Sequence, residues 1–283
     1  MKVKEAYSYL VEHLLKIEDS YFAKKEAREI LSHLLNLSPF EIHLHPEKEV
    51  PQNEIEKILK ERLTLKPLPY ILKKAYFFGR PFYIKEGVLI PRQESEVLIE
   101  VVLNILRKKS IDSGTFLELG CGSGILSITL LLELTKFSGF AIDISSKALI
   151  ITKKNASYHK VYERLRLIKG NWFSPIKKWP LFDFIISNPP YLSEEEWESL
   201  DPEVKLFEPK EALYAGKEGT EFQERLLKEA HHYLKKEGFL IFEMGYNQSQ
   251  KISKLSKFYG WKYQFFRDLL NYERVALLWR ENM

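Results

Sequence analysis

From about residue 92 onwards, the chain alternates short apolar runs with longer amphipathic segments, and this alternation constrains its fold more than any other feature. The apolar runs have the length of strands, and the segments between them repeat apolar residues at helical spacing. Strands that alternate with helices form a mostly parallel sheet with helices on both faces. The sequence therefore predicts an α/β fold with strands FLEL, FAID, LRLIKG, FDFIIS, GFLIFEMG and VALLW, and with helices at 93–108, 125–134, 146–159, 221–235 and from 248.

The first 74 residues show helical periodicity without intervening strand-like runs. Asn53, three residues before Glu56, matches the capping box that opens a helix. From residue 75, the stretch AYFFGRPFYI places strand-forming aromatic residues on both sides of Gly-Arg-Pro, which predicts a hairpin. We therefore predict a small all-α bundle over 1–74, a β-hairpin linker over 75–91 and an α/β domain over 92–283.

Composition excludes several classes of protein. No run reaches the roughly 18 consecutive apolar residues of a membrane span, and acidic residues near the N-terminus argue against a signal or transit peptide. The single cysteine, Cys121, excludes an intramolecular disulfide, and no set of histidines, cysteines or acids has metal-ligand spacing. We therefore expect a cytoplasmic protein that associates with no membrane and holds no metal.

The net charge of +4 is spread evenly along the chain. Residues 1–75 carry 13 Lys and Arg against 12 Asp and Glu, and the totals of 43 and 39 leave 30 and 27 for the remainder. Neither part is a basic arm of the kind that nucleic-acid binders use. We therefore expect no direct contact with nucleic acid. Separately, we expect the protein to be a monomer.

A glycine-rich loop, in the run FLELGCGSG, connects the first strand of the α/β domain to a helix. Glycines at such a turn let the backbone pass close beneath a ligand, toward which the helix N-terminus directs its N–H groups. A purely structural strand-to-helix turn is the alternative. The predicted binding loop consists of Gly120, Cys121, Gly122, Ser123 and Gly124.

An acid follows this loop at the distance expected of a ribose-binding group. Asp143 closes the next apolar strand, 19 residues past Gly124. A helix N-cap is the alternative role, and both roles can coexist. The loop is GxGxG preceded by Glu118, and this spacing favours a nucleoside without a pyrophosphate over a dinucleotide. The pattern resembles the cofactor-binding half of class I S-adenosylmethionine-dependent methyltransferases, which implies a Rossmann-like sheet and S-adenosylmethionine as cofactor.

In such enzymes, the loop after the next strand borders the adenine. The resemblance therefore implies that Asn171 contacts the base and that Trp172 offers it a flat apolar face. A buried tryptophan at a strand end is the alternative for Trp172.

The strand FDFIIS ends on a stiff corner, because proline fixes its own φ and restricts the residue before it. We expect this strand beside the cofactor-binding strand, so that the corner reaches the reactive end of the cofactor. Asn188 and the Pro189 carbonyl can accept hydrogen bonds from a planar NH2 group, and the Tyr191 ring offers it a shelf. A proline turn with a capping asparagine is the alternative. The predicted catalytic corner is Asn188, Pro189, Pro190 and Tyr191.

Further motifs make the resemblance closer. In order, PLPYIL, FFGRPF, VLIPRQESE, LELGCGSG, NASYH, GNWFSP, SNPPY, FEPKEALYAGKEG, GFLIFEMGYNQ and DLLNYERV are similar to the release factor glutamine methyltransferases of the HemK/PrmC family. The resemblance implies N5-methylation of the glutamine in the Gly-Gly-Gln motif of bacterial class I peptide chain release factors. The match runs from about residue 65 to the end. We predict that the N-terminal bundle docks this substrate, and a purely structural bundle with solvated helix faces is the alternative.

The chain departs from the family pattern at a few positions. Gln93-Glu94-Ser95 stands where the family usually has Pro-Glu-Thr, Asn171 where it often has Asp, and Asn271 where glycine is common. Two other functions stay open at this point. An amino-group methyltransferase for an exocyclic amine in DNA or ribosomal RNA would share the Asn-Pro-Pro-Tyr corner, and a non-catalytic binding protein would not require it.

Overall fold

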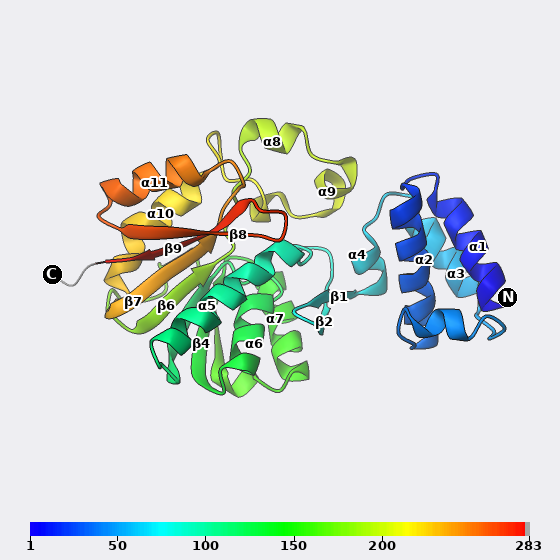
Figure 1. Ribbon diagram of the computed structural model, residues 1–283, viewed down its shortest axis with the longest axis horizontal. Coiled ribbons are helices and arrows are strands. Elements are labelled where there is room, and N and C mark those ends of the chain that lie inside the picture. The colour runs from blue at the N-terminus through cyan, green and yellow to red at the C-terminus, as the bar shows by residue number, and fades with distance from the viewer. Residues whose placement is uncertain (281–283) are drawn as a thin grey trace. The chain divides into compact units, whose positions relative to one another are not determined.

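The computed structural model describes residues 1–280 and divides the chain into two compact units. The first unit consists of Met1–Lys74 with Asp201–Phe207, and the second of Ala75–Leu200 with the described part of Glu208–Met283. In chain order, the elements are α1 (Val3–Leu14), α2 (Ser20–Leu35), η1 (Glu41–Leu44), α3 (Gln52–Arg62), α4 (Leu68–Leu72), β1 (Lys74–Phe77), β2 (Arg80–Tyr83), η2 (Gln93–Ser95), α5 (Glu96–Lys108), β3 (Ser113–Leu119), α6 (Ile125–Glu133), β4 (Lys136–Asp143), α7 (Ser146–Tyr158), η3 (Tyr162–Arg164), β5 (Leu165–Lys169), β6 (Phe182–Ser187), α8 (Glu194–Glu198), α9 (Pro202–Phe207), η4 (Lys210–Ala212), α10 (Glu221–Glu229), η5 (Ala230–His232), β7 (Leu234–Glu243), α11 (Ser249–Phe258), β8 (Lys262–Arg267) and β9 (Glu273–Trp279) (Figure 1).

The second unit is built on a seven-stranded sheet with strand order β5-β4-β3-β6-β7-β9-β8. β3 pairs in parallel with both β4 and β6, whereas β9 pairs antiparallel with β7 and β8. This mostly parallel sheet confirms the predicted fold class, including the position of FDFIIS beside the strand that leads into the glycine loop. β8, at one edge, was not predicted.

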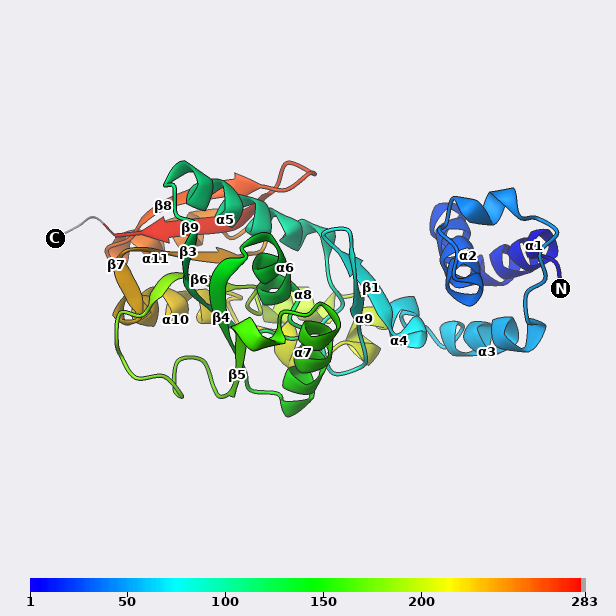
Figure 2. The ribbon, with the colours of Figure 1, turned by 90° about the horizontal axis from the view of Figure 1, so that it is seen from below.

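Helices cover both faces of this sheet (Figure 1, Figure 2). On one face, Leu226 of α10 and Ile252 of α11 share a buried apolar cluster with Leu240 of β7. On the other face, where α5, α6 and α7 pack, the Phe184 ring stacks on the rings of Phe116 and Phe239, with centroids 5.1 and 5.2 Å apart. Burial on both faces explains why β6 and the second half of β7 are almost continuously apolar.

The strands β1 and β2 form a separate two-stranded sheet, as the aromatic stretch after residue 74 predicts. Phe77 and Phe82, one from each strand, are buried and meet edge to face with ring centroids 6.5 Å apart. The φ of Gly79 is +72°, which fits the turn between these strands.

The first unit is a helical bundle around one apolar cluster, to which α1, α2 and α3 contribute. Its third helix begins two residues earlier than the sequence predicts. The N-cap of α3 is Pro51, and the Gln52 side chain donates a hydrogen bond to Glu56 Oε1 at 2.8 Å. The capping box predicted at Asn53 is therefore wrong. None of the helices in residues 1–280 is long and apolar enough to cross a bilayer.

A buried arginine holds the first unit together. Arg62, at the end of α3, is 1% exposed, and its guanidinium pairs with Glu18, Glu26 and Glu203. The nitrogen–oxygen distances to Glu26 and Glu203 are both 2.9 Å. Because Glu203 lies in α9, this cluster joins the short segment 201–207 to the bundle.

Candidate functional site

A pocket of about 410 Å³ lies in the second unit at the carboxyl ends of β3, β4 and β6. The strand order reverses here, because the chain runs from β3 to β4 and β5 on one side and then returns to β6 on the other. This is the position at which α/β sheets bind ligands, and the volume suits a small molecule. The predicted residues that line the pocket are Gly120, Cys121, Gly122, Ser123, Asp143, Asn171, Trp172, Asn188, Pro189 and Pro190.

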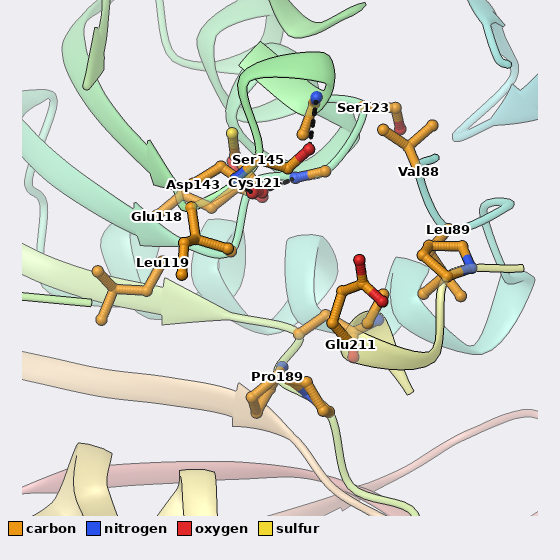
Figure 3. A pocket seen from close by; sticks show the side chains of 18 of the residues that line it. Val88, Leu89, Glu118, Leu119, Cys121, Ser123, Asp143, Ser145, Pro189 and Glu211 are labelled. Atoms are coloured by element: carbon orange, nitrogen blue, oxygen red, sulfur yellow. Dashed lines mark hydrogen bonds between the residues drawn. The ribbon is translucent and has the colours of Figure 1, made fainter. Parts of the chain in front are cut away.

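Figure 3 shows the pocket from close by, with Cys121, Asp143 and Ser145 on one side and Pro189 and Glu211 on the other. The structure thus brings the glycine loop, the acid and the proline corner to one cavity. Two predicted residues, Gly124 and Tyr191, are not among those that line it.

The glycine loop requires glycine for two different reasons. Gly120 and Gly122 have φ angles of +71° and +54°, and a Cβ atom at either position would meet nothing within 4 Å. Their conformation, and not crowding, therefore selects glycine there. Gly124, the N-cap of α6, has φ +82°, and a Cβ atom would also lie 2.6 Å from Thr152 Cγ2. It fixes the close approach of α6 to α7.

Asp143 holds the loop through its carboxylate. Its Oδ2 atom accepts a hydrogen bond from the Gly122 N–H, and Oδ1 accepts one from the Ser145 N–H, each at 2.8 Å. The N-cap of α7 is Ser145, whose side chain accepts from Ala148 N–H, so Asp143 does not have the alternative capping role. Burial raises the pKa of Asp143, and the hydrogen bonds from Ser145 and Gly122 oppose this shift.

Two other titratable groups are buried here, Glu118 at the end of β3 and Cys121 in the glycine loop. Burial raises the pKa of Glu118 to about 8, although its carboxyl accepts hydrogen bonds from the Ser127 hydroxyl and N–H. Burial also raises the pKa of the Cys121 thiol, which lies 3.6 Å from Thr152 Oγ1. A thiol with a raised pKa is a poor nucleophile, so Cys121 acts as a small buried side chain in the loop.

Asn155 joins the glycine loop to the hairpin, a connection that sequence reasoning missed. Its Nδ2 atom donates to the Ser123 carbonyl at 2.9 Å and to the Tyr83 carbonyl at 3.0 Å. Its Oδ1 atom accepts from the Tyr83 N–H at 2.8 Å. A fully buried amide that satisfies three backbone groups fixes the loop against β2.

An aromatic pair lines the pocket, with Trp172 from the loop after β5 and Phe222 from α10. Trp172 stacks on Phe222, with ring centroids 5.1 Å apart and planes 16° apart. Its φ of +57° costs a non-glycine residue roughly 1–2 kcal/mol, so the surrounding contacts hold it in place. The Arg225 guanidinium lies 5.6 Å from the Trp172 ring centroid, and it donates to Asn171 Oδ1 at 3.4 Å. Neither Phe222 nor Arg225 was predicted.

The proline corner follows β6. Asn188, Pro189 and Pro190 line the pocket, whereas Tyr191 does not. Asn188 donates through Nδ2 to Ser95 Oγ at 3.0 Å, which leaves Oδ1 as its other polar atom. The Tyr191 hydroxyl instead forms a hydrogen bond with Glu243, and burial raises the Tyr191 pKa. The shelf role of Tyr191 therefore stays a prediction.

Arg92 lines the pocket next to the linker and pairs with Glu208. Arg92 Nη2 donates to Glu208 Oε1 at 2.5 Å, and the Ile90 N–H donates to Oε2 of the same carboxylate at 3.1 Å. Glu208 is 5% exposed, whereas the Arg92 side chain is 35% exposed, so only the carboxylate end of this pair is buried. In residues 1–280, no three His, Cys, Asp or Glu side chains form a cluster that would hold a metal ion.

Two family models match this chain. The PrmC N-terminal domain matches residues 5–72, and the methyltransferase small domain matches residues 93–204. A release factor glutamine methyltransferase of Aquifex aeolicus (strain VF5) is 39% identical over 99% of this chain and 96% of its own. A second, of Nitratidesulfovibrio vulgaris, is 35% identical over 87% of this chain and 84% of its own. A bifunctional methyltransferase of Rickettsia prowazekii is 36% identical over 88% of this chain, which spans 52% of that relative.

Solved structures share the fold at low identity. The hMettl16 catalytic domain in complex with MAT2A 3'UTR hairpin 6 has a TM-score of 0.56 and 18% identity, over 72% of this chain and 76% of its own. A methyltransferase from Pyrococcus furiosus has a TM-score of 0.51 and 18% identity, over 81% of this chain and 98% of its own. At this identity, the likeness shows the fold alone.

Proposed function

This chain belongs to the release factor glutamine methyltransferase family, and we propose that it methylates a glutamine of a peptide chain release factor with S-adenosylmethionine as donor. The acceptor is the side-chain N5 of the glutamine in the Gly-Gly-Gln motif of bacterial class I release factors. The observation that carries this proposal is one pocket lined by both the glycine loop and the Asn-Pro-Pro corner.

The pocket fits the cofactor. The glycine loop bends its backbone at the end of β3 and leaves open space above Gly120 and Gly122. Each carboxylate oxygen of Asp143 accepts one backbone N–H, so lone pairs remain for the hydroxyl groups of a ribose. Trp172 and Asn171 lie on the adenine side by analogy with the family. When bound, S-adenosylmethionine supplies an electrophilic methyl group.

The corner suits a planar amide. A carboxamide NH2 is a poor nucleophile, so the protein must orient it and favour the positive charge that grows on nitrogen. Asn188 donates with Nδ2 to Ser95, so its Oδ1 atom is the one that accepts from a substrate. The Pro189 carbonyl is a second acceptor, and proline geometry keeps it fixed. The acceptor nitrogen gains the methyl group and loses one proton to water, so no residue is assigned as a separate general base.

The partners follow from the same proposal. We propose that the chain acts as a monomer on release factor in the cytoplasm. We also propose that the bundle of residues 1–74, which matches the PrmC N-terminal domain at 5–72, docks the release factor. No contact with nucleic acid is part of the reaction.

Label transfer tests the proposed function against its alternative. The purified chain is incubated with methyl-labelled S-adenosylmethionine and, in separate reactions, with class I release factor, ribosomal RNA and DNA. We expect label on the release factor, and none on the same factor with its Gly-Gly-Gln glutamine changed to alanine. Label on RNA or DNA instead would favour methylation of an exocyclic base amine.

A further inference from the structure

We propose that Glu243 and Ser95 set which end of the Asn188 amide faces the substrate, and that they are positioning residues for methyl transfer. This inference rests on the proposed function, because it concerns how Asn188 holds the acceptor amide. Neither side chain was predicted to take part in the site.

A chain of hydrogen bonds links these residues across the sequence. Ser95 Oγ donates to Glu243 Oε2 at 2.5 Å, and Asn188 Nδ2 donates to the same Ser95 Oγ at 3.0 Å. Ser95 is fully buried and Glu243 is 1% exposed, so water does not compete for these bonds. Glu243 ends β7, Ser95 ends η2 and Asn188 follows β6, so three separate segments must fold together to form the chain.

The direction of this chain follows from Glu243. An ionised carboxylate only accepts, so it takes the single hydroxyl hydrogen of Ser95. The Ser95 oxygen then presents a lone pair to Asn188, and only the NH2 end of the Asn188 amide can bind it. The two ends of an asparagine side chain have nearly the same shape, so hydrogen bonding decides between them. Glu243 thereby directs Asn188 Oδ1 away from Ser95.

Protonation of Glu243 removes this control. The neutral acid has a hydrogen of its own to give to Ser95, which frees the Ser95 hydrogen to bind Asn188 Oδ1. The amide can then turn and present NH2 to the NH2 of the substrate, a pair of donors that cannot bond. The charged or titratable neighbours of Glu243 are Tyr191, which donates to it, Arg274, which favours the ionised form, and Glu94, which opposes it. Burial is the largest influence, and it raises the pKa of Glu243 to about 7.

Kinetics of three variants and one control test the proposal. We expect Ser95→Ala to lower kcat by about tenfold, which corresponds to about 1.4 kcal/mol and lies within the range of one hydrogen bond. Ser95→Thr, which keeps the hydroxyl, should restore most of that loss. The control Ser256→Ala removes another fully buried hydroxyl, in α11, and should leave kcat unchanged. Calorimetry should give the same S-adenosylmethionine Kd for wild type and Ser95→Ala.

The pH profile separates this role from simple structural support. In wild type, kcat should fall as the pH drops through about 7, because Glu243 becomes protonated. Glu243→Gln cannot titrate, so its lower kcat should show no such fall. A Ser95→Ala variant with wild-type kcat, or with weakened cofactor binding to match its lost activity, would overturn the proposal. So would an unchanged acid limb in Glu243→Gln.

A spectroscopic readout keeps the test independent of the substrate. In the ¹⁵N-labelled full chain, the Asn188 side-chain NH2 signals are assigned by their loss in Asn188→Ala. They should shift with a midpoint near pH 7 in wild type and stay constant in Glu243→Gln. If wild type labels no release factor, the proposed function fails while this titration still decides the positioning role. Signals that do not titrate in wild type would contradict it.

Discussion

Asn188 contributes one side chain to two tasks, since its NH2 end is held by Ser95 and its Oδ1 end is left for a substrate. Sequence reasoning identified this residue because a local motif, a polar residue before two prolines, sets it apart. Ser95 and Glu243 lie in the stretches VLIPRQESE and GFLIFEMGYNQ, but no local motif indicates that they act with Asn188. They meet across 148 residues of chain, so only the folded structure places them together. A single acid in the apolar run FLIFEM was the one hint that β7 ends on a functional group.

Asn188→Ala should abolish most methyl transfer. The variant loses one of two acceptors for the substrate amide, and loss of one such group typically lowers kcat by about 10²–10³-fold. Cofactor binding should persist in part, because the glycine loop and Asp143 are unchanged. Turnover with release factor and calorimetry with S-adenosylmethionine measure the two effects. Full activity in this variant would contradict the proposed mechanism.

Asp143→Ala should weaken S-adenosylmethionine binding by about tenfold or more, since it removes charge-assisted hydrogen bonds to the ligand and to the loop. Without the carboxylate, the N–H groups of Gly122 and Ser145 lose their acceptors. Calorimetry gives the Kd. Asp183→Asn is the matched control, because Asp183 also accepts from a backbone N–H, that of Thr115, but does not line the pocket. Equal Kd values for wild type and Asp143→Ala would rule out the ribose role.

At the scale of elements, the buried apolar strand β6 was predicted correctly, whereas the end of the helix before β7 was not. The strand FDFIIS coincides with β6, Phe182–Ser187. The helix predicted over 221–235 instead ends with α10 at Glu229, and a single 3-10 turn leads into β7 at Leu234. The polar stretch LKKE favours a helix locally, but Leu234 pairs with Phe182 of β6, and this tertiary contact decides.

Glu118, at the carboxyl end of β3, makes stability depend on pH. Its pKa is raised from 4.5 to about 8, so the folded chain keeps a proton that the unfolded chain releases above about pH 4.5. The free energy of unfolding therefore falls as the pH rises from about 4.5 to about 8. Glu118→Gln should raise the unfolding free energy at pH 9 by roughly 2–4 kcal/mol, and have little effect at pH 4.5.

Urea unfolding of the cofactor-free chain at both pH values measures this effect. Glu100→Gln, an exposed position on α5, is the control and should change neither value. An equal effect of Glu118→Gln at pH 4.5 and pH 9 would show that Glu118 is ionised in the folded chain.

At the scale of the whole molecule, the chain forms two units that each have their own core. The sequence indicated a bundle and an α/β domain, because apolar periodicity changes near residue 75. It did not indicate that Asp201–Phe207, which lies between α8 and the pocket residue Pro209, would join the first unit. Arg62 and Glu203, two residues far apart in sequence, form a charge pair that links this segment to the first unit.

Arg62→Leu should destabilise the first unit by about 3–5 kcal/mol, because it leaves three carboxylates without their buried partner. Glu203→Gln should lower the free energy of unfolding by less than Arg62→Leu, since the Glu203 side chain is 32% exposed and can be solvated. Hydrogen exchange resolves the two units. The amides of α1, α2 and α3 should lose protection in Arg62→Leu, while those of β3 and β6 keep it. Unchanged protection of the bundle would contradict the role given to Arg62.

The central claim is that the pocket with Asn188 places a methyl group on one glutamine amide of a release factor. Fragmentation mass spectrometry of peptides from release factor, after reaction with wild type and with Asn188→Ala, locates the group directly. We predict a single methyl group on the side-chain nitrogen of the Gly-Gly-Gln glutamine after reaction with wild type, and an unmodified peptide after reaction with Asn188→Ala. Methylation at another residue, or the same modification by both proteins, would contradict the claim.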